Sequence, residues 1–196
     1  FNKKLDESIK KLTILIQTCL YLCFILFVIF TSNPFLVNAI KAEEGMGLNP
    51  ILQDPILAIH PPTLYLGYIG FSLILSLALA GLLLDKIDSK WIINAKNWTL
   101  FCWSSLTAGI ALGSYWAYYE LGWGGFWFWD PVENVSLMPW LALTTLFHCI
   151  LVLEKRLALT SWVVILSIAT FTLSMCGTFL VRSGILNSVH TFANDP

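Results

Sequence analysis

The sequence predicts an all-α integral membrane protein with about five transmembrane helices and an outward-facing tryptophan-rich loop. Hydrophobic residues make up 57% of the 196 residues and charged residues only 12%, about half the charged share of a typical soluble domain. The apolar residues also gather into five runs, each about as long as the 20 or so residues that a helix needs to cross a bilayer. We expect residues 1–196 to form a single membrane domain, with spans at about 12–32, 64–84, 98–117, 135–153 and 159–180.

Lysine and arginine are distributed unevenly between the two sides that these spans define. One side carries only Lys41 and Arg182. The other carries the remaining nine: Lys3, Lys4, Lys10, Lys11, Lys86, Lys90, Lys96, Lys155 and Arg156. Positive residues are enriched in short loops on the cytoplasmic or matrix side of a membrane. The N-terminus is therefore predicted on that side, and the outward regions are 33–63, 118–134 and 181–196.

Composition and motifs exclude several classes of function. The net charge is −1, so no basic surface indicates a nucleic-acid partner. The five cysteines all lie in apolar runs without a CxxC pair, which argues against a disulfide framework or a zinc site. No Walker loop, HExxH or GxSxG motif is present. Gly109 and Gly113 form a GxxxG pattern in the third span, which predicts close approach of a neighbouring helix.

The segment 116–134 is unusually aromatic. Indole and phenyl rings form a rigid apolar wall that suits a flat hydrophobic ligand, and glycines between them allow the backbone to approach that ligand closely. The alternative interpretation is a re-entrant segment that only anchors the protein at the membrane surface. The aromatic side chains from 118 to 129 are Tyr118, Tyr119, Trp123, Phe126, Trp127, Phe128 and Trp129.

The carboxylates of this segment have a structural explanation. Asp130, Pro131 and Glu133 occupy the positions of an N-cap, a proline at N1 and an acid at N3, which is typical of the start of a helix. We therefore favour helix capping over acid–base chemistry for Asp130 and Glu133. The role of Glu120 stays open.

The three histidines have different settings. His60 precedes the second span and His190 lies in the C-terminal tail, so both are predicted on the outside. Two imidazoles from separate loops can hold a metal from opposite sides, as in bis-histidine haem, although ordinary interfacial histidines would look the same. Arg182, near His190, could pair with a haem propionate or be a lone interfacial charge.

His148 lies inside the fourth predicted span. An ionisable group at this depth is costly unless it faces protein and has a partner. No other histidine lies within a predicted span, so a haem ligated by His148 would take its second axial ligand from elsewhere. A hydrogen bond from His148 to a neighbouring helix is an equal alternative.

The run 123–134 resembles the "WWD" signature of haem-handling membrane proteins. The segments 60–65, 177–184 and 188–193 narrow the resemblance to the family of cytochrome c maturation protein F (CcmF), the membrane core of the system I cytochrome c haem lyase. The resemblance extends from about residue 48 to residue 196. Phe126 is a departure, because the family usually has tryptophan there.

The resemblance implies a set of site residues. His60 and His190 would ligate the iron of incoming haem, and His148 would be one of two membrane histidines that hold a resident haem b. Trp123, Trp127, Trp129 and Asp130 would form the platform that positions haem, with Arg182 near a propionate. No catalytic residue in the narrower sense is identified.

The resemblance also implies an activity and partners. The chain would be a subunit of the haem lyase, which receives haem from the chaperone CcmE and attaches it to apocytochrome c with CcmH- and CcmI-type subunits. Family members are longer and have a second membrane histidine. We therefore expect a fragment, or one part of a split mitochondrial CcmF that is inactive alone and lies in the mitochondrial inner membrane. The bacterial inner membrane is the alternative location. The alternative functions are a haem relay or exporter resembling CcmC and a catalytically silent structural subunit.

Overall fold

The computed structural model describes residues 5–37, 44–45, 47–122 and 124–188. Within these ranges the chain is helical and has no strand, which confirms the all-α class. The elements are α1 (Glu7–Thr31), the short 3-10 helix η1 (Pro50–Leu52), α2 (Pro55–Leu83), α3 (Ser89–Glu120), α4 (Pro131–Arg156) and α5 (Thr160–Arg182).

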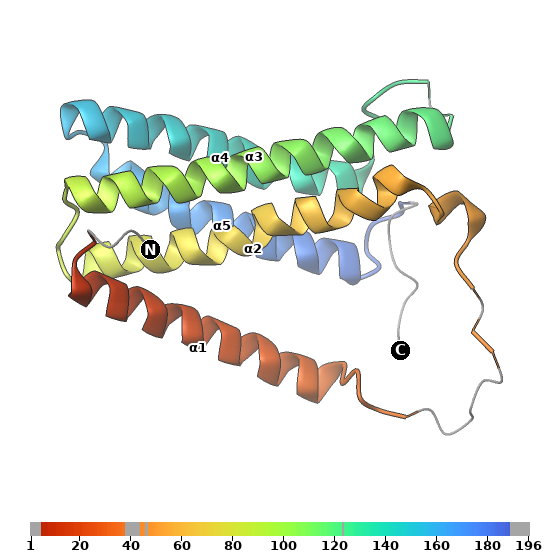
Figure 1. The fold of residues 1–196 in the computed structure, drawn as a ribbon, viewed down its shortest axis with the longest axis horizontal. Helices are drawn as coiled ribbons and strands as arrows, with labels where there is room; N and C mark the ends of the chain where they lie inside the picture. The colour runs from red at the N-terminus through yellow and green to blue at the C-terminus, as the bar shows by residue number, and fades with distance from the viewer. Residues whose placement is uncertain (1–4, 38–43, 46, 123, 189–196) are drawn as a thin grey trace.

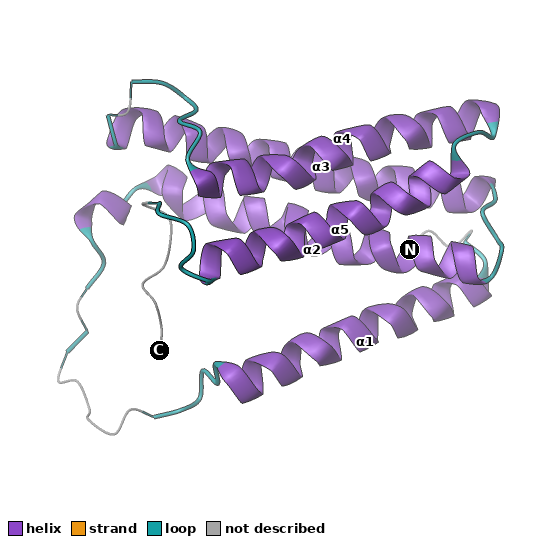
Figure 2. Cartoon of the chain, turned by 180° about the vertical axis from the view of Figure 1, so that it is seen from behind, coloured by secondary structure: helices purple, strands orange, loops and turns teal. Residues whose placement is uncertain are grey.

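Helices α2 to α5 lie side by side as a bundle, and α1 diverges from it (Figure 1; Figure 2). The buried residues of α1 are Ile9 and Thr13, both near its start. One turn further on, the Gln17 amide donates to Ser72 Oγ at 2.9 Å. Beyond this point α1 presents large apolar side chains such as Phe27 and Phe30 to the surroundings. Contact between α1 and the bundle is therefore concentrated at one end.

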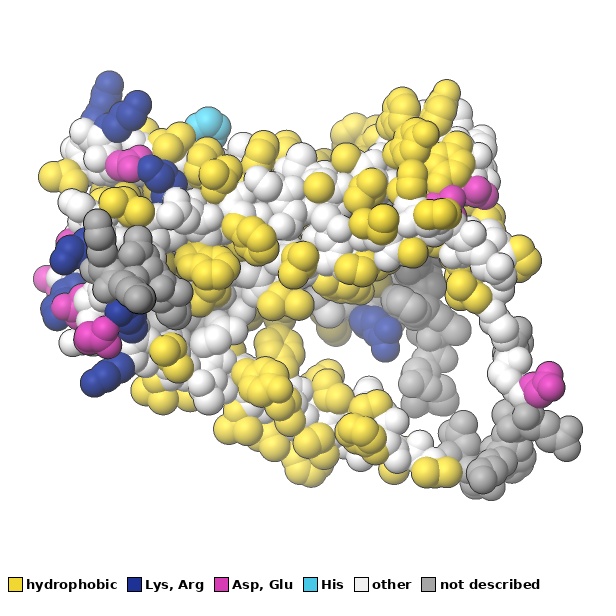
Figure 3. Space-filling model, viewed as in Figure 1, with side chains coloured by type: hydrophobic (Ala, Val, Ile, Leu, Met, Phe, Trp, Pro, Cys, Tyr) yellow, Lys and Arg dark blue, Asp and Glu magenta, His cyan; other side chains and the backbone are white. Residues whose placement is uncertain are grey.

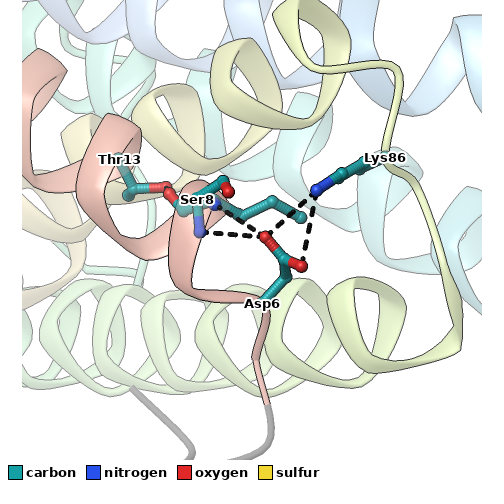
Figure 4. A network of polar contacts seen from close by, with 5 residues as sticks. Asp6, Ser8, Thr13 and Lys86 are labelled. Carbon is teal, nitrogen blue, oxygen red and sulfur yellow. Dashed lines mark hydrogen bonds and ion pairs between the residues drawn. The ribbon is translucent and has the colours of Figure 1, made fainter.

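Asp6 joins α1 to the loop between α2 and α3 (Figure 4). Its carboxylate accepts from the Ser8 N–H at 2.9 Å and caps α1, and it also pairs with Lys86 Nζ at 3.4 Å. The hydrogen bond from Ser8 is the main cause that lowers the pKa of Asp6, and Lys86 adds to it. Asp6 thus holds the beginning of α1 against the bundle.

Charged side chains gather at the end of the bundle where α1 begins (Figure 3). The ion pair between Lys96 and Glu154 connects α3 with α4 near this end. Among the described residues, the lysines predicted to share one side of the membrane therefore lie at one end of the bundle. The loop 121–130 lies at the opposite end (Figure 1).

Helices α2 and α3 form the tightest contact of the bundle. A Cβ added at Gly109 would lie 2.7 Å from the Leu64 Cα, and one added at Gly67 would lie 3.0 Å from the Leu106 backbone nitrogen. Only glycine allows backbones this close. Nearer the charged end, buried Trp91 donates its indole N–H to the Leu77 carbonyl at 2.9 Å.

Four helices of the described chain, α1, α2, α4 and α5, are long and apolar enough to cross a membrane. The predicted third span, 98–117, lies inside α3, which has 32 residues but is not among those four. Serine, threonine, glycine, tryptophan and tyrosine make α3 less apolar than its neighbours. The helix count of the bundle agrees approximately with the prediction.

We expected His60 to precede the second span, but it lies inside helix α2. Helix α2 starts at Pro55, with the Asp54 carboxylate accepting from the Ile56 and Leu57 N–H groups at 2.8 and 3.0 Å. The helix then runs through Pro61 and Pro62. Pro61 and Pro62 lie beyond the first turn of α2, where N–H groups need no intrahelical partner, so each proline removes one helical hydrogen bond.

Candidate functional site

The aromatic loop, residues 121–130, connects α3 with α4 and depends on backbone conformations that glycine adopts readily. Gly122 and Gly124 have φ of 63° and 74°, and Trp129 has φ of 58°, which is rare for a tryptophan. This conformation leaves Trp129 71% exposed, while Trp127 is half-buried. The site residue Trp123 lies outside the described residues.

Three hydrogen bonds fix the aromatic loop on the start of α4. Asp130 Oδ2 accepts from the Val132 N–H at 2.9 Å, which confirms Asp130 as the N-cap. Glu133 Oε2 accepts from the Phe128 N–H at 3.1 Å. The Asn134 amide donates to the Trp129 carbonyl at 3.0 Å. The N-cap role of Asp130 is therefore confirmed. Glu133 lies in the first turn of α4 as predicted, but its carboxylate accepts from the Phe128 N–H in the loop and not from the N–H of the N-cap residue.

The C-terminal tail returns to the aromatic loop. Ser188 Oγ donates to Asp130 Oδ2 at 2.7 Å, across 58 residues of sequence. His190 follows two residues later but lies outside the described residues, so its predicted role stays a prediction. Arg182 ends α5 and is exposed. The described part of the tail, residues 183–188, therefore lies at the same end of the bundle as the aromatic loop.

His60 points from α2 onto α3. Its Nδ1–H donates to the Gly109 carbonyl at 2.6 Å, and its ring lies against Gly113. The ring also lines a cavity of about 120 Å³ between α2, α3 and the start of α4. The other residues that line this cavity are Leu57, Leu64, Ile110, Gly113, Ser114, Trp116, Ala117, Trp127, Val132, Glu133 and Ser136.

Two indole N–H groups in this cavity lack an acceptor. Trp116 is 7% exposed, and the Nε1 atoms of Trp116 and Trp127 are both buried with no partner among the described residues. Buried donors are normally paired, so two unpaired ones in one cavity indicate a place for a hydrogen-bond acceptor that is not part of the described chain.

Removing one of these N–H groups should cost little stability. Both Trp116→Phe and Trp91→Phe should lower the free energy of unfolding, and we expect the loss in Trp91→Phe to be larger by about 1–2 kcal/mol. The reason is that the Trp91 N–H has a partner, the Leu77 carbonyl, and the Trp116 N–H has none among the described residues. Both side chains are buried, and both variants lose the same atoms. Denaturant titration of the two variants would check this, and equal losses would contradict it.

Asp54 and Tyr119 bring the start of α2 to the end of α3. The Tyr119 hydroxyl donates to the Asp54 carboxylate, and this hydrogen bond is the main cause that lowers the pKa of Asp54. The pKa of Tyr119 is raised to about 12, first by desolvation and then by Asp54. The contact holds His60, one and a half turns beyond Asp54, next to the aromatic loop.

Replacing Asp54 with asparagine should lower the pKa of Tyr119 toward its usual 10.0, because the carboxylate disfavours the phenolate. The raised pKa of Tyr119 means that the contact stabilises the fold up to about pH 10 and is lost as the pH rises through about 12. The lowered pKa of Asp54 means that the contact is also lost in acid, when this carboxylate is protonated. Alkaline titration of phenolate absorbance, taken as a difference against Tyr119→Phe, would measure this. An unchanged Tyr119 pKa in Asp54→Asn would contradict it.

His148 lies apart from the cavity. It is exposed on α4, about 22 Å along the helix from Glu133 at 1.5 Å per residue. Its ring is 6.2 Å from that of Phe147. The described residues hold no group of three or more His, Cys, Asp or Glu side chains placed for a metal ion. His148 therefore faces outward from this bundle, toward lipid or another polypeptide.

Sequence reasoning missed some residues of the site. Trp116, Gly113 and Ser188 were not singled out as site residues, although Trp116 opens the predicted aromatic segment. A GxxxG pattern ending one turn before a tryptophan was the available signal for the first two. No local pattern marks the contact of Ser188 with Asp130.

The fold and the site define an all-α membrane protein with an aromatic, histidine-lined cavity at one end of its bundle. The family described as "Cytochrome C assembly protein" matches residues 1–186. The chain belongs to this family, and its similarity to CcmF proteins agrees with the resemblance stated above.

Curated relatives are similar over the whole chain. The chain is 58% identical over 196 residues to the cytochrome c-type biogenesis protein CycK of Rhizobium meliloti (strain 1021), covering 100% of this chain and 29% of that protein. It is 50% identical over 197 residues to CcmF of Escherichia coli (strain K12), covering 100% of this chain and 30% of that protein. A solved structure titled "Cytochrome c Heme Lyase CcmF" superposes with a TM-score of 0.75 at 32% identity, over 93% of this chain and 29% of the other. The chain thus spans less than a third of the length of these relatives.

Proposed function

We propose that this chain is part of a cytochrome c haem lyase and binds haem at the aromatic loop and His60 for covalent attachment to apocytochrome c. The observation that carries the proposal is the cavity that His60 shares with Trp116 and Trp127. The names of the relatives, cytochrome c-type biogenesis proteins and a haem lyase, support the same function.

The residues of the cavity fit haem. His60 offers an imidazole, and neutral imidazole is a common axial ligand of haem iron. The exposed faces of Phe126, Phe128 and Trp129 offer apolar surface for a flat ring. The unpaired N–H groups of Trp116 and Trp127 offer donors to an acceptor. A cavity of about 120 Å³ is too small for a whole porphyrin, so haem would also need the apolar surface of the aromatic loop.

In this proposal the chain positions haem and excludes water, while haem supplies the vinyl groups that react with the thiols of apocytochrome c. His60 and His190 would ligate the haem iron. Trp123, Trp127 and Trp129 would help to hold the haem, and Asp130 keeps the loop in place through Val132 and Ser188. Correct placement of two reacting groups can by itself lower the barrier by several kcal/mol.

His148 is proposed as one ligand of a second, resident haem b. Its exposure on α4 supports a ligand set completed by another polypeptide or by another part of a longer protein. No role in the cavity fits it, because it lies several helical turns from Glu133.

The partners and the location are also proposals. We propose CcmE as haem donor, apocytochrome c as acceptor, and CcmH- and CcmI-type subunits as neighbours, together with the part of CcmF that supplies the second membrane histidine. The relatives named above are bacterial and favour the bacterial inner membrane. They give no support to the predicted mitochondrial location. Their names also favour a lyase over a haem relay resembling CcmC or a silent structural subunit.

Haem spectra of the purified complex test this function. We expect His148→Ala to lose b-type haem, and His60→Ala combined with His190→Ala to keep it but to fail to capture haem from the chaperone. Reduced-minus-oxidised and pyridine haemochrome spectra would measure both. Thr145→Ala, one turn from His148 on the exposed face of α4, is the matched control. Unchanged haem content in all variants would contradict the proposal.

A further inference from the structure

We infer that Gly109 and Gly113 form a seat that fixes the tautomer and the orientation of the His60 ring, so that Nε2 is its metal-binding nitrogen. Both glycines lie on α3, one helical turn apart, and both touch His60 of α2. The inference rests on the proposed function in one respect, the use of His60 as a ligand. Gly109 and Gly113 are positioning residues, since they act through His60.

The tautomer follows from the partner of Nδ1. The Gly109 carbonyl can only accept a hydrogen bond, and it lies 2.6 Å from His60 Nδ1. Nδ1 must therefore carry the proton, and in a neutral ring the lone pair is on Nε2. Histidines that ligate metals commonly donate their other N–H to a backbone carbonyl in this way.

The orientation follows from the surface of Gly113. A Cβ added there would lie 2.5 Å from Cε1, 2.9 Å from Nδ1 and 3.0 Å from Nε2 of His60. The nitrogen-bearing edge of the ring thus rests on the space that any side chain at position 113 would occupy. Alanine would push away the ring edge that carries both nitrogens.

The Gly109 carbonyl and the Gly113 Cα restrict different motions of the His60 ring. The hydrogen bond to Gly109 restricts rotation about the Cβ–Cγ bond, and contact with Gly113 restricts how far the ring can tilt toward α3. Gly109 also keeps the helices close, because a Cβ there would meet the Leu64 backbone at 2.7 Å. The GxxxG pattern therefore serves the histidine as well as helix packing.

Nitrogen NMR of the histidine rings tests the seat without haem. The full chain, labelled with ¹⁵N-histidine in lipid nanodiscs at mildly alkaline pH, should show His60 as the Nδ1–H tautomer, assigned by its loss in His60→Ala. In Gly113→Ala we expect loss of that single state and a mixture of tautomers. Gly177→Ala is the matched control, because its added Cβ would also lie 2.5 Å from a neighbour, Val135 Cγ1, and it should leave the His60 signals unchanged.

Haem titration of the same variants adds a second measurement. We expect Gly113→Ala to weaken haem capture about 10- to 100-fold, as loss of a supporting contact to a metal ligand does, and Gly177→Ala to bind as wild type. Near-ultraviolet circular dichroism of the stacked pair Trp103 and Trp140 would show that the bundle is folded. A wild-type His60 in the Nε2–H tautomer, or a Gly113→Ala spectrum identical to wild type, would overturn the seat. If His60→Ala captures haem normally, the proposed function fails, while the NMR result still decides the seat.

Discussion

Replacing Gly109 with alanine is expected to destabilise the bundle by about 3 kcal/mol, at the upper end of the usual cost of overpacking. The added Cβ would lie 2.7 Å from the Leu64 Cα, 2.8 Å from its nitrogen and 2.9 Å from its Cβ. Backbone atoms cannot rotate away, so α2 and α3 would have to separate along their closest contact. The carbonyl that orders His60 would move with them.

Unfolding of purified variants in mixed detergent and denaturant would measure this loss. Gly177→Ala carries the same added methyl, but its close neighbour is Val135 Cγ1 at 2.5 Å, the end of a side chain that can change rotamer. We expect it to cost less than about 1 kcal/mol. Equal losses in the two variants would mean that helix separation does not limit stability at Gly109.

Replacing Asp130 with alanine is expected to cost about 1–2 kcal/mol, the usual loss for a helix cap, and to release the C-terminal tail. Asp130 Oδ2 accepts from both the Val132 N–H and the Ser188 hydroxyl. One substitution therefore removes both the N-cap hydrogen bond of α4 and the hydrogen bond that links the tail to the aromatic loop. Faster amide hydrogen exchange at 183–188 and at 130–134 would measure the two effects.

Two variants separate these effects. Asp130→Asn keeps an oxygen that caps helices almost as well and should retain most of the stability. Ser188→Ala removes only the tail link, so exchange should rise at 183–188 and stay unchanged in the first turn of α4. If amide exchange at 183–188 is as slow in Ser188→Ala as in wild type, the hydrogen bond to Asp130 does not hold the tail.

The start of α4 shows what could be predicted from the sequence. Asp130 caps α4 through the Val132 N–H and Pro131 takes the first helical position, and local rules of capping predict both. The bond of Glu133 to Phe128 and the contact of Asp130 with Ser188 lie outside those rules. The membrane class was predictable for a similar reason, because the length and apolarity of each run decide whether it can cross a bilayer. Four helices of the described chain are long and apolar enough to cross a membrane, which agrees with this prediction.

The setting of His60 could not be predicted in the same way. The apolar run predicted a second span from about residue 64, with His60 before it, whereas Asp54 caps α2 and the helix already begins at Pro55. The partners of His60, Gly109 and Gly113, are 49 and 53 positions away. Contacts at this separation depend on how α2 packs on α3, which no local pattern specifies. The ligand roles of His60, His148 and His190 stay predictions.

The one-ended attachment of α1 has a consequence for how this helix resides in the bilayer. Only 6% of the most apolar 18-residue segment of α1 is buried by the rest of the described chain. Insertion of α1 into the bilayer therefore depends on the transfer of its side chains from water to hydrocarbon and not on packing against α2 to α5. Acyl chains, or further polypeptide of a longer protein, would occupy the open groove of about 430 Å³ lined by Leu20, Cys23, Phe24, Phe27, Phe171 and Met175. Tilting of α1 can accommodate a difference between its length and the bilayer thickness, and the Asp6–Lys86 contact anchors the end about which it would tilt.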